Sequence, residues 1–357
     1  MDPLPAGLAS LRDHEACARE RLDPAAWSYI SGAAGERLTC AGNRVAWDRM
    51  QLLPRVLRPL AEGHTRVELL GRTLAHPILL APVAYQRLAH PDGEIASAHA
   101  AAAQQAGMVV STQASVRMED VARAVRAEPD RGPLWFQLYF QPDRGITEDL
   151  VVRAQAAGYE ALVVTVDAPV HGGRPGFRLP PGITAASLEG YGTQPQELAQ
   201  DAFTRMAHAP TWDDIEWVLG IARMPVVLKG ILHPEDARLA VRMGVSAVVV
   251  SNHAGRALDG AAASAAVLPQ VATAVGVDVP VLVDGGIRTG VDILKASALG
   301  ARAVLVGQPL MWGLACAGAV GVAHVLRLLR DELAIAMALC GCASLAEAGP
   351  GLLLGQA

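Results

Sequence analysis

The chain has 357 residues, of which 52% are hydrophobic and 18% are charged. This length and composition allow either one large barrel or two modest domains, with a sizeable buried core. The formal net charge is −5 and no basic tract is visible, which argues against a nucleic-acid partner. The net charge does not exclude an anionic substrate, because individual arginines decide that binding.

Cysteine spacing and the apolar segments bear on where the protein works. None of the five cysteines forms a CxxC or zinc-ribbon pair, which is typical of free thiols in a reducing cytoplasm. They are Cys17, Cys40, Cys316, Cys340 and Cys342. The N-terminus lacks a basic segment followed by an apolar one, and the most apolar late segment, residues 318–339, contains Arg327 and Asp331. We therefore expect a cytoplasmic protein with no signal peptide, membrane span or metal site.

Eight short apolar runs recur along the chain, as in strands that are buried on both faces of a parallel sheet. They are Pro77–Ala81, Met108–Ser111, Leu134–Leu138, Ala161–Val166, Pro225–Lys229, Ala247–Ser251, Pro280–Asp284 and Ala303–Gly307. Alanine-rich helix candidates lie between them, such as Glu94–Ala106, Pro234–Met243 and Gly290–Leu299. The alternation predicts an α/β fold, a TIM (β/α)₈ barrel. The alternative is an open doubly wound sheet, although no GxGxxG motif opens the first βα unit.

Three segments fall outside the eight units of this single domain, which we expect to span residues 1–357. Residues 1–76 are predicted to form an N-terminal helical extension that ends in a turn-rich connector. Residues 168–211 form a long loop insertion after the fourth strand, and loops of this length are usually functional or mobile. The C-terminal helix, residues 318–339, is expected to pack outside the barrel.

Reactive side chains follow four of the predicted strands, at the end where barrels build their sites. These side chains are Tyr139, Asp167, Lys229 and His253. Any one of them alone is more often a satisfied polar residue, but together they indicate a catalytic site. His253 can act as a base because imidazole titrates near neutrality, and Asp167 could orient its ring.

Two arginines near the candidate base suggest a carboxylate substrate, because the guanidinium fork matches that anion. Arg256 lies three residues after His253, and Arg174 lies near the start of the insertion. From spacing alone, a solvated loop residue is the better explanation of Arg174.

Glycines after the seventh and eighth strands favour a phosphate site, because they let backbone N–H groups approach an anion at a helix N-terminus. An ordinary tight turn with a surface arginine explains the same pattern about equally well. The residues concerned are Asp284, Gly285, Gly286, Arg288, Gly307 and Gln308.

Five motifs together resemble the FMN-dependent 2-hydroxy acid oxidase and dehydrogenase family, which includes glycolate oxidase, lactate oxidase and mandelate dehydrogenase. They are SNHAGRALDG (251–260), VDGGIRTGVDILKASALGA (283–301), APVAYQRLAHPDGE (81–94), WFQLYF (135–140) and TVDAPVHGGR (165–174). The resemblance covers nearly the whole chain and looks strongest to the members that act on aromatic hydroxy acids, in particular 4-hydroxymandelate oxidase. It implies FMN as cofactor, a small 2-hydroxy acid and O₂ as substrates, and a homo-oligomer.

The resemblance also implies a role for each candidate residue. His253 would be the base at the substrate, supported by Asp167, while Arg256 and Arg174 would hold the carboxylate and Tyr139 would bond the hydroxyl or the carboxylate. The expected flavin-binding residues are Pro82, Val83, Ala84, Ser111, Gln137, Thr165, Lys229, Ser251, Asp284, Gly285, Gly286, Arg288, Gly307 and Gln308.

Departures from the family pattern bear on the substrate and the electron acceptor. Ser28 stands where the family has a substrate-binding tyrosine, and Gln113 stands where glycolate oxidases have a tryptophan, so we expect an aromatic substrate. Gln308 replaces the phosphate-loop arginine that the family has after the eighth strand. Ala254 replaces a glycine of the family's HGGR motif, which is a small change in side-chain size. Ala84 is typical of oxidases near the flavin, so we expect O₂ rather than a quinone as acceptor. A dehydrogenase, a flavin-containing isomerase and a sugar-phosphate lyase on the same barrel remain alternatives.

Overall fold

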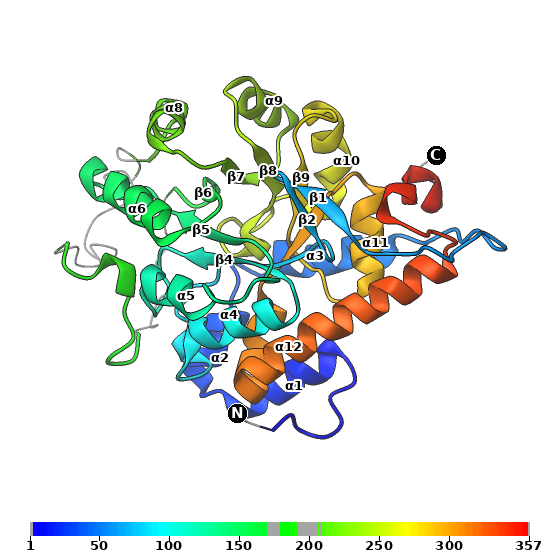
Figure 1. Ribbon diagram of the computed structural model, residues 1–357, viewed down its shortest axis with the longest axis horizontal. Coiled ribbons are helices and arrows are strands. Elements are labelled where there is room, and N and C mark those ends of the chain that lie inside the picture. The colour runs from blue at the N-terminus through cyan, green and yellow to red at the C-terminus, as the bar shows by residue number, and fades with distance from the viewer. Residues whose placement is uncertain (1–2, 170–178, 192–205, 207–208, 356–357) are drawn as a thin grey trace.

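Eight parallel strands close into a barrel in the computed structural model, which describes residues 3–169, 179–191, 206 and 209–355 (Figure 1). The strands are β3 (Ile78–Leu80), β4 (Gly107–Ser111), β5 (Leu134–Leu138), β6 (Leu162–Thr165), β7 (Val226–Ile231), β8 (Ala247–Val250), β9 (Val281–Val283) and β10 (Ala303–Val306). They pair in chain order, and β10 closes on β3 with Val304 opposite Ile78. The predicted TIM barrel and its eight strands are therefore confirmed.

Helices surround the barrel and cover the outer faces of its strands (Figure 1). Those that follow the barrel strands are α4 (Gly93–Ala103), α5 (Met118–Ala124), α6 (Arg144–Ala157), α8 (Trp212–Ile221), α9 (Pro234–Arg242), α10 (Ser264–Val275), α11 (Gly290–Ala298) and α12 (Gln308–Leu339). Shorter 3₁₀ turns are η1 (Gln86–Leu88), η2 (Ala186–Leu188), η4 (His253–Gly255), η5 (Leu345–Glu347) and η6 (Pro350–Leu352). Strand residues such as Val249 and Leu282 are fully buried, because both faces of each strand pack against apolar side chains.

The N-terminal extension is helical as predicted, but its connector contains a β-hairpin that the sequence analysis missed. The helices are α1 (Leu11–Arg21), α2 (Pro24–Ser31) and α3 (Leu38–Arg49), and the hairpin strands are β1 (Val67–Leu69) and β2 (Arg72–Leu74). Leu70 and Gly71 have φ of 47° and 77°, so they form a two-residue turn in the left-handed region. The sequence signal for it is the alternation of Val67, Glu68 and Leu69 before Gly71, which is too short to identify a strand.

The predicted C-terminal helix is the second part of α12, which begins ten residues earlier at Gln308. Ala317 and Gly318 have non-helical backbone, and Gly318 has a φ of 52°, so the helix breaks there. α12 packs outside the barrel against α1, α4 and α11, as expected (Figure 1). It is long and apolar enough to cross a membrane, but 72% of its most apolar stretch is buried in the fold, which is typical of a core helix.

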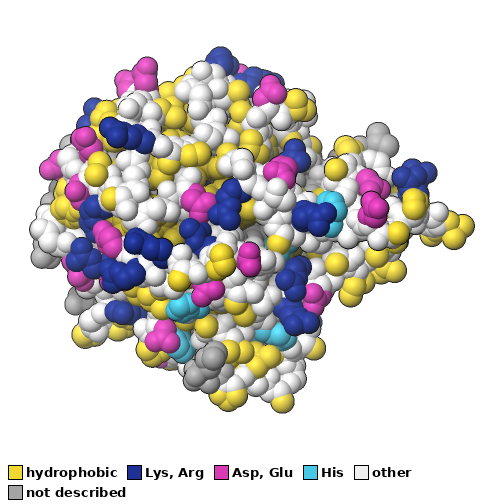
Figure 2. Space-filling model, in the orientation of Figure 1, with side chains coloured by type: hydrophobic (Ala, Val, Ile, Leu, Met, Phe, Trp, Pro, Cys, Tyr) yellow, Lys and Arg dark blue, Asp and Glu magenta, His cyan; other side chains and the backbone are white. Residues whose placement is uncertain are grey.

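The described residues of the insertion are 168–169, 179–191, 206 and 209–211, and its 3₁₀ turn η2 packs against α5 and α6. The Met118 amide donates to Ser187 Oγ at 3.0 Å, and Arg153 donates to the Ser187 carbonyl at 2.9 Å. Arg174 lies outside the described residues. On the outer surface, positive and negative side chains are interspersed (Figure 2), and no extended basic face is visible on the side shown.

Candidate active site

His253 lies between an acid and a phenol at the carboxyl ends of the barrel strands. Its Nδ1 is 2.8 Å from Asp167 Oδ1, and its Nε2 is 3.4 Å from the Tyr139 hydroxyl. Parallel pairing brings β6 and β8 to the two sides of β7, so Asp167 and His253 meet across the end of that strand. A carboxylate on one ring nitrogen leaves the other free to exchange a proton with a substrate.

A glycine makes room for the acid. Strand β7 has an irregularity between Lys229 and Ile231, where Gly230 has a φ of 113°. A Cβ on Gly230 would lie 2.6 Å from Asp167 Cβ, so a larger residue would displace the carboxylate. Burial raises the pKa of Asp167, but the charges of Lys229 and His253 outweigh burial and hold that pKa below its usual value. The acid therefore stays a carboxylate.

Lys229 connects Asp167 to Asp284, which follows β9 at the barrel mouth. Its Nζ lies 3.1 Å from Asp284 Oδ2 and 4.0 Å from Asp167 Oδ2, and it donates to Ser251 Oγ at 2.8 Å. Burial lowers the pKa of Lys229, but the two carboxylates outweigh it and hold the pKa above its usual value. The ammonium group is therefore a fixed positive charge beside the site.

Arg256 is held by the C-terminal end of α2. Its guanidinium donates to the carbonyls of Tyr29, Ile30 and Gly32 at 3.0–3.2 Å and lies over the Tyr29 ring at 5.3 Å. Burial lowers its pKa. Among the described residues its hydrogen-bond partners are neutral carbonyls, so a substrate carboxylate would supply a matching charge.

A second buried guanidinium lies beside the glycine-rich loop. Arg288 donates to the Gln308 side chain and to the Ile287 carbonyl, and it lies 4.7 Å from the centre of the Trp312 ring. Burial lowers the pKa of Arg288 to about 10. Gln308 thus orients the arginine instead of adding a second charge. Because the described side-chain partners are neutral, a phosphate fits this position.

The glycines after β9 and β10 differ in how closely they are packed. Gly285 and Gly286 have φ of 92° and 80°, and a Cβ on Gly286 would lie 2.7 Å from the Asn43 carbonyl oxygen. A Cβ on Gly307 would meet only Ala81 and Val83, at 3.6 Å and 3.7 Å. Glycine is therefore required at 286 by packing, whereas a Cβ at Gly307 would make only ordinary van der Waals contacts.

Three buried polar atoms at the barrel mouth have no partner among the described residues: Gln137 Nε2, Thr165 Oγ1 and Asp284 Oδ1. The other end of the Gln137 amide is fixed, because its Oε1 accepts from Ser111 Oγ at 3.1 Å and from the Thr112 amide at 3.2 Å. Buried polar atoms need partners, and the polar edge of an isoalloxazine ring offers both donors and acceptors. Pro82, Val83 and Ala84 follow β3 and are half-buried. These residues fit FMN.

Sequence reasoning missed the contribution of α3. Trp47 Nε1 donates to the Gly285 carbonyl at 2.8 Å, and Arg44 donates to the Gly286 carbonyl at 2.7 Å. Asp259, the acid in the SNHAGRALDG motif, accepts from the Thr39 amide at 2.9 Å at the start of α3. Nothing local in the sequence pairs Asp259 with Thr39, 220 positions away.

The two residues used to predict an aromatic substrate differ in their surroundings. Ser28 is exposed on α2, whereas the neighbouring Tyr29 is half-buried against Arg256. The Tyr29 ring meets the Tyr85 ring edge-on, with 6.0 Å between the ring centres. Gln113 is half-buried. The space that Ser28 was expected to open is therefore bordered by the Tyr29–Tyr85 pair.

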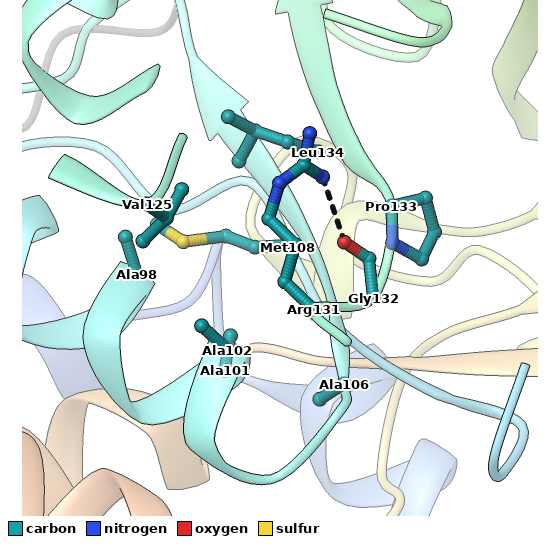
Figure 3. Close-up of a pocket in the computed structure, with 10 residues that line it drawn as sticks. All are labelled: Ala98, Ala101, Ala102, Ala106, Met108, Val125, Arg131, Gly132, Pro133 and Leu134. Atoms are coloured by element: carbon teal, nitrogen blue, oxygen red, sulfur yellow. Dashed lines mark hydrogen bonds between the residues drawn. The ribbon is translucent and has the colours of Figure 1, made fainter. Parts of the chain in front are cut away.

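The cavity drawn in Figure 3 is not a substrate site. It measures about 10 Å³ and is lined largely by apolar side chains of α4, β4 and β5, with the Arg131 guanidinium bonded to the Gly132 carbonyl (Figure 3). A larger cavity of about 570 Å³ lies between the β1–β2 hairpin and the loop before β10. Both are formed by residues other than those of the strand-end cluster.

Comparisons with known proteins agree with this arrangement. The family model for FMN-dependent dehydrogenases matches residues 18–354. The chain is 47% identical to an L-lactate oxidase of Alicycliphilus denitrificans, over 97% of this chain and 96% of that protein. It is 44% identical to a 4-hydroxymandelate oxidase of Amycolatopsis orientalis, over 95% and 96%. A crystal structure of mandelate oxidase with (S)-2-phenylpropionate matches with a TM-score of 0.87 and 43% identity, over 97% of each chain.

Proposed function

Because the chain belongs to the FMN-dependent dehydrogenase family, whose relatives oxidise 2-hydroxy acids, we propose that it oxidises an aromatic (S)-2-hydroxy acid, mandelate or 4-hydroxymandelate, to the 2-oxo acid and reduces O₂ to H₂O₂. The observation that carries the proposal is the position of His253 between Asp167 and Tyr139. The same cluster includes Arg256, whose guanidinium binds the substrate carboxylate.

Each side chain has a separate task in this reaction. Arg256 fixes the carboxylate, and Tyr139 donates to the substrate. Burial, followed by the charge of Asp167, raises the pKa of Tyr139 well above its usual value, so the phenol keeps its proton. His253 Nε2 accepts a proton from the substrate, and Asp167 stabilises the imidazolium that results. When bound, FMN would supply the acceptor for the two electrons and for the second hydrogen that leave the hydroxy acid.

An aromatic substrate is supported by the walls of the site. Tyr29 and Tyr85 meet edge-on beside Arg256, and a phenyl ring on the substrate Cα would add to that aromatic contact. Burial of the ring contributes roughly 25 cal/mol per Å² of apolar area removed from water. Relatives named for mandelate and 4-hydroxymandelate oxidation agree with this choice.

L-Lactate is the second candidate substrate. Tyr29 lies against Arg256, next to the position where the family carries its substrate-binding tyrosine, so its ring refills space that a bulky side chain would need. Relatives at 47% and 45% identity are named as L-lactate oxidases.

Steady-state kinetics with peroxide detection test the proposal. We expect kcat/KM for (S)-mandelate or 4-hydroxymandelate to exceed that for L-lactate and glycolate at least tenfold, with one H₂O₂ formed per oxo acid. (R)-Mandelate is the stereochemical control. Equal or better activity on L-lactate would show that the substrate is lactate and not an aromatic hydroxy acid. A reduced enzyme that does not react with oxygen but reduces quinones rapidly would show that the protein is a dehydrogenase and not an oxidase.

A further inference from the structure

Asn43 of α3 makes an uncommon pairing of buried amides at the base of the active site. Its Nδ2 donates to Asn252 Oδ1 at 2.9 Å, and its Oδ1 accepts from Asn252 Nδ2 at 2.7 Å. The Asn43 Oδ1 also accepts from the Ser264 amide at 3.2 Å. Both asparagines are almost fully buried, at 2% and 4% exposure. Since each amide satisfies the other, loss of one leaves the partner without two bonds.

Asn252 connects this amide pair to the turn that carries the base. Its Oδ1 also accepts from the Gly255 amide at 3.2 Å, across a turn in which His253, Ala254 and Gly255 have φ of 55°, 53° and 75°. Non-glycine residues adopt this left-handed region at a cost in free energy, so two in succession persist only when their surroundings hold them. The asparagine side chain is one of the groups that holds them.

Helix α3 also packs closely against the turn. A Cβ on Gly255 would lie 2.5 Å from the Cys40 amide nitrogen, so no larger residue fits between the turn and the helix. The backbone of α3 thus limits the space at Gly255, while the Asn43–Asn252 pair holds the Gly255 amide. His253 and Arg256 stand at the two ends of this turn.

We propose that Asn43 is a positioning residue for the oxidation: through Asn252 it holds the left-handed turn that aims His253 at the substrate and places Arg256 on the carboxylate. This inference rests on the role proposed for His253 above. Neither asparagine touches substrate or cofactor in the proposal, and both act through the backbone of residues 253–256.

Asn43 packs beside Gly285, where a Cβ would lie 3.2 Å from Asn43 Nδ2, but the side-chain hydrogen bonds of α3 to the glycine-rich loop come from Arg44 and Trp47. Arg44 donates to the Gly286 carbonyl and forms a bidentate pair with Asp292 at 2.6 Å and 2.8 Å, and Trp47 donates to the Gly285 carbonyl. Loss of the Asn43 amide should therefore disturb the base and leave the flavin bound.

The test is a double-mutant cycle read out by anaerobic flavin reduction with the preferred hydroxy acid. In the FMN-loaded protein, Asn43→Leu should slow reduction at least tenfold while the FMN dissociation constant changes less than threefold. In a His253→Asn background the same substitution should cost a clearly smaller fold-loss than in the wild-type background, because one of the two groups that it misplaces is already gone and only the effect on Arg256 remains. Asn43→Ser, which is too short to reach Asn252, should behave in the same way if the leucine variant does not fold.

Lys295→Met is the matched structural control. Lys295 Nζ donates to the Trp47 carbonyl at 2.8 Å, so its loss loosens the same helix without touching the amide pair. It should lower the melting temperature and leave the reduction rate within twofold. Equal fold losses for Asn43→Leu in both backgrounds, an unchanged rate, or loss of FMN from both Asn43 variants would overturn the proposal. Failure of the wild-type protein to reduce FMN with any hydroxy acid would instead overturn the proposed function.

Discussion

Lys229 Nζ and Asp284 Oδ2 form a buried ion pair of 3.1 Å between the ends of β7 and β9. Both side chains are at most 10% exposed, and the same ammonium lies 4.0 Å from Asp167. One cation therefore stabilises two carboxylates at the barrel mouth. One of these carboxylates supports the base, so the charge balance of the site depends on this lysine.

Replacement of this lysine should destabilise the protein. Lys229→Met leaves two buried carboxylates without their cation, and breaking a buried pair costs about 3–5 kcal/mol. Urea unfolding of the FMN-loaded wild type and variant at neutral pH measures the difference. Asp284→Asn is the comparison, because Lys229 then keeps Asp167 and the expected loss is smaller. Equal stability of wild type and Lys229→Met would contradict the ion-pair account.

Arg288 should contribute to FMN binding through the phosphate alone. Arg288→Gln removes a charge-assisted hydrogen bond, worth roughly 1.5–3 kcal/mol, so the FMN dissociation constant should rise at least tenfold. Riboflavin lacks the phosphate, and its affinity should change less than threefold. Fluorescence titration with both ligands makes the comparison. Parallel losses for FMN and riboflavin would remove Arg288 from the phosphate site.

Arg256 should discriminate a carboxylate from its neutral analogue. Arg256→Met removes the charge that the α2 carbonyls hold in place, so kcat/KM for the hydroxy acid should fall at least tenfold. The corresponding primary amide or methyl ester should lose much less, because it carries no charge. An unchanged acid-to-amide preference in the variant would rule out this arginine as the carboxylate ligand.

His76 should make the fold sensitive to mild acid. Burial, followed by the charge of Arg330, lowers the pKa of His76 from 6.5 to about 4, although the bond from its Nε2 to the Gln104 carbonyl acts in the opposite direction. Its Nδ1 accepts from the Ile78 amide, which requires the neutral ring. The unfolded chain therefore binds the proton first as pH falls, and the free energy of unfolding should decline between about pH 6.5 and 4, by on the order of 3 kcal/mol. His76→Gln should flatten this decline.

Exposed His99 provides the control for the pH profile. His99→Gln should leave the slope unchanged. Burial and the nearby His324 also lower the pKa of the buried His14 to about 4. Part of the decline in the free energy of unfolding should therefore remain in every variant. A wild-type stability that is flat from pH 6.5 to 4 would contradict the assignment of a neutral His76.

The barrel could be predicted from the sequence because its strands are buried on both faces. Leu134–Leu138 was predicted with the bounds that the structure has, and Pro225–Lys229 differs from Val226–Ile231 by the irregular end of β7. Continuous apolar runs of this kind report burial directly. The β1–β2 hairpin was missed because three-residue strands and a Leu-Gly turn carry too little periodic signal.

The strand-end rule brought together the residues of the site that follow barrel strands. Asp167, Lys229 and His253 meet as expected, since the carboxyl ends of neighbouring parallel strands share one mouth. Asn43 and Trp47 could not be predicted in this way, because their partners are more than 200 residues away and helix patterning reports only which face is buried. The same limit applies to Tyr29, whose contact with Arg256 depends on how α2 docks.

Anaerobic mixing of FMN-loaded protein with (S)-mandelate tests the role of His253 most directly. The wild-type flavin should bleach within seconds. His253→Asn should retain bound FMN but reduce it at least 10²-fold more slowly, because removal of a general base typically costs 10²–10⁴-fold. Bleaching of the variant at the wild-type rate would contradict the assignment of His253 as the base.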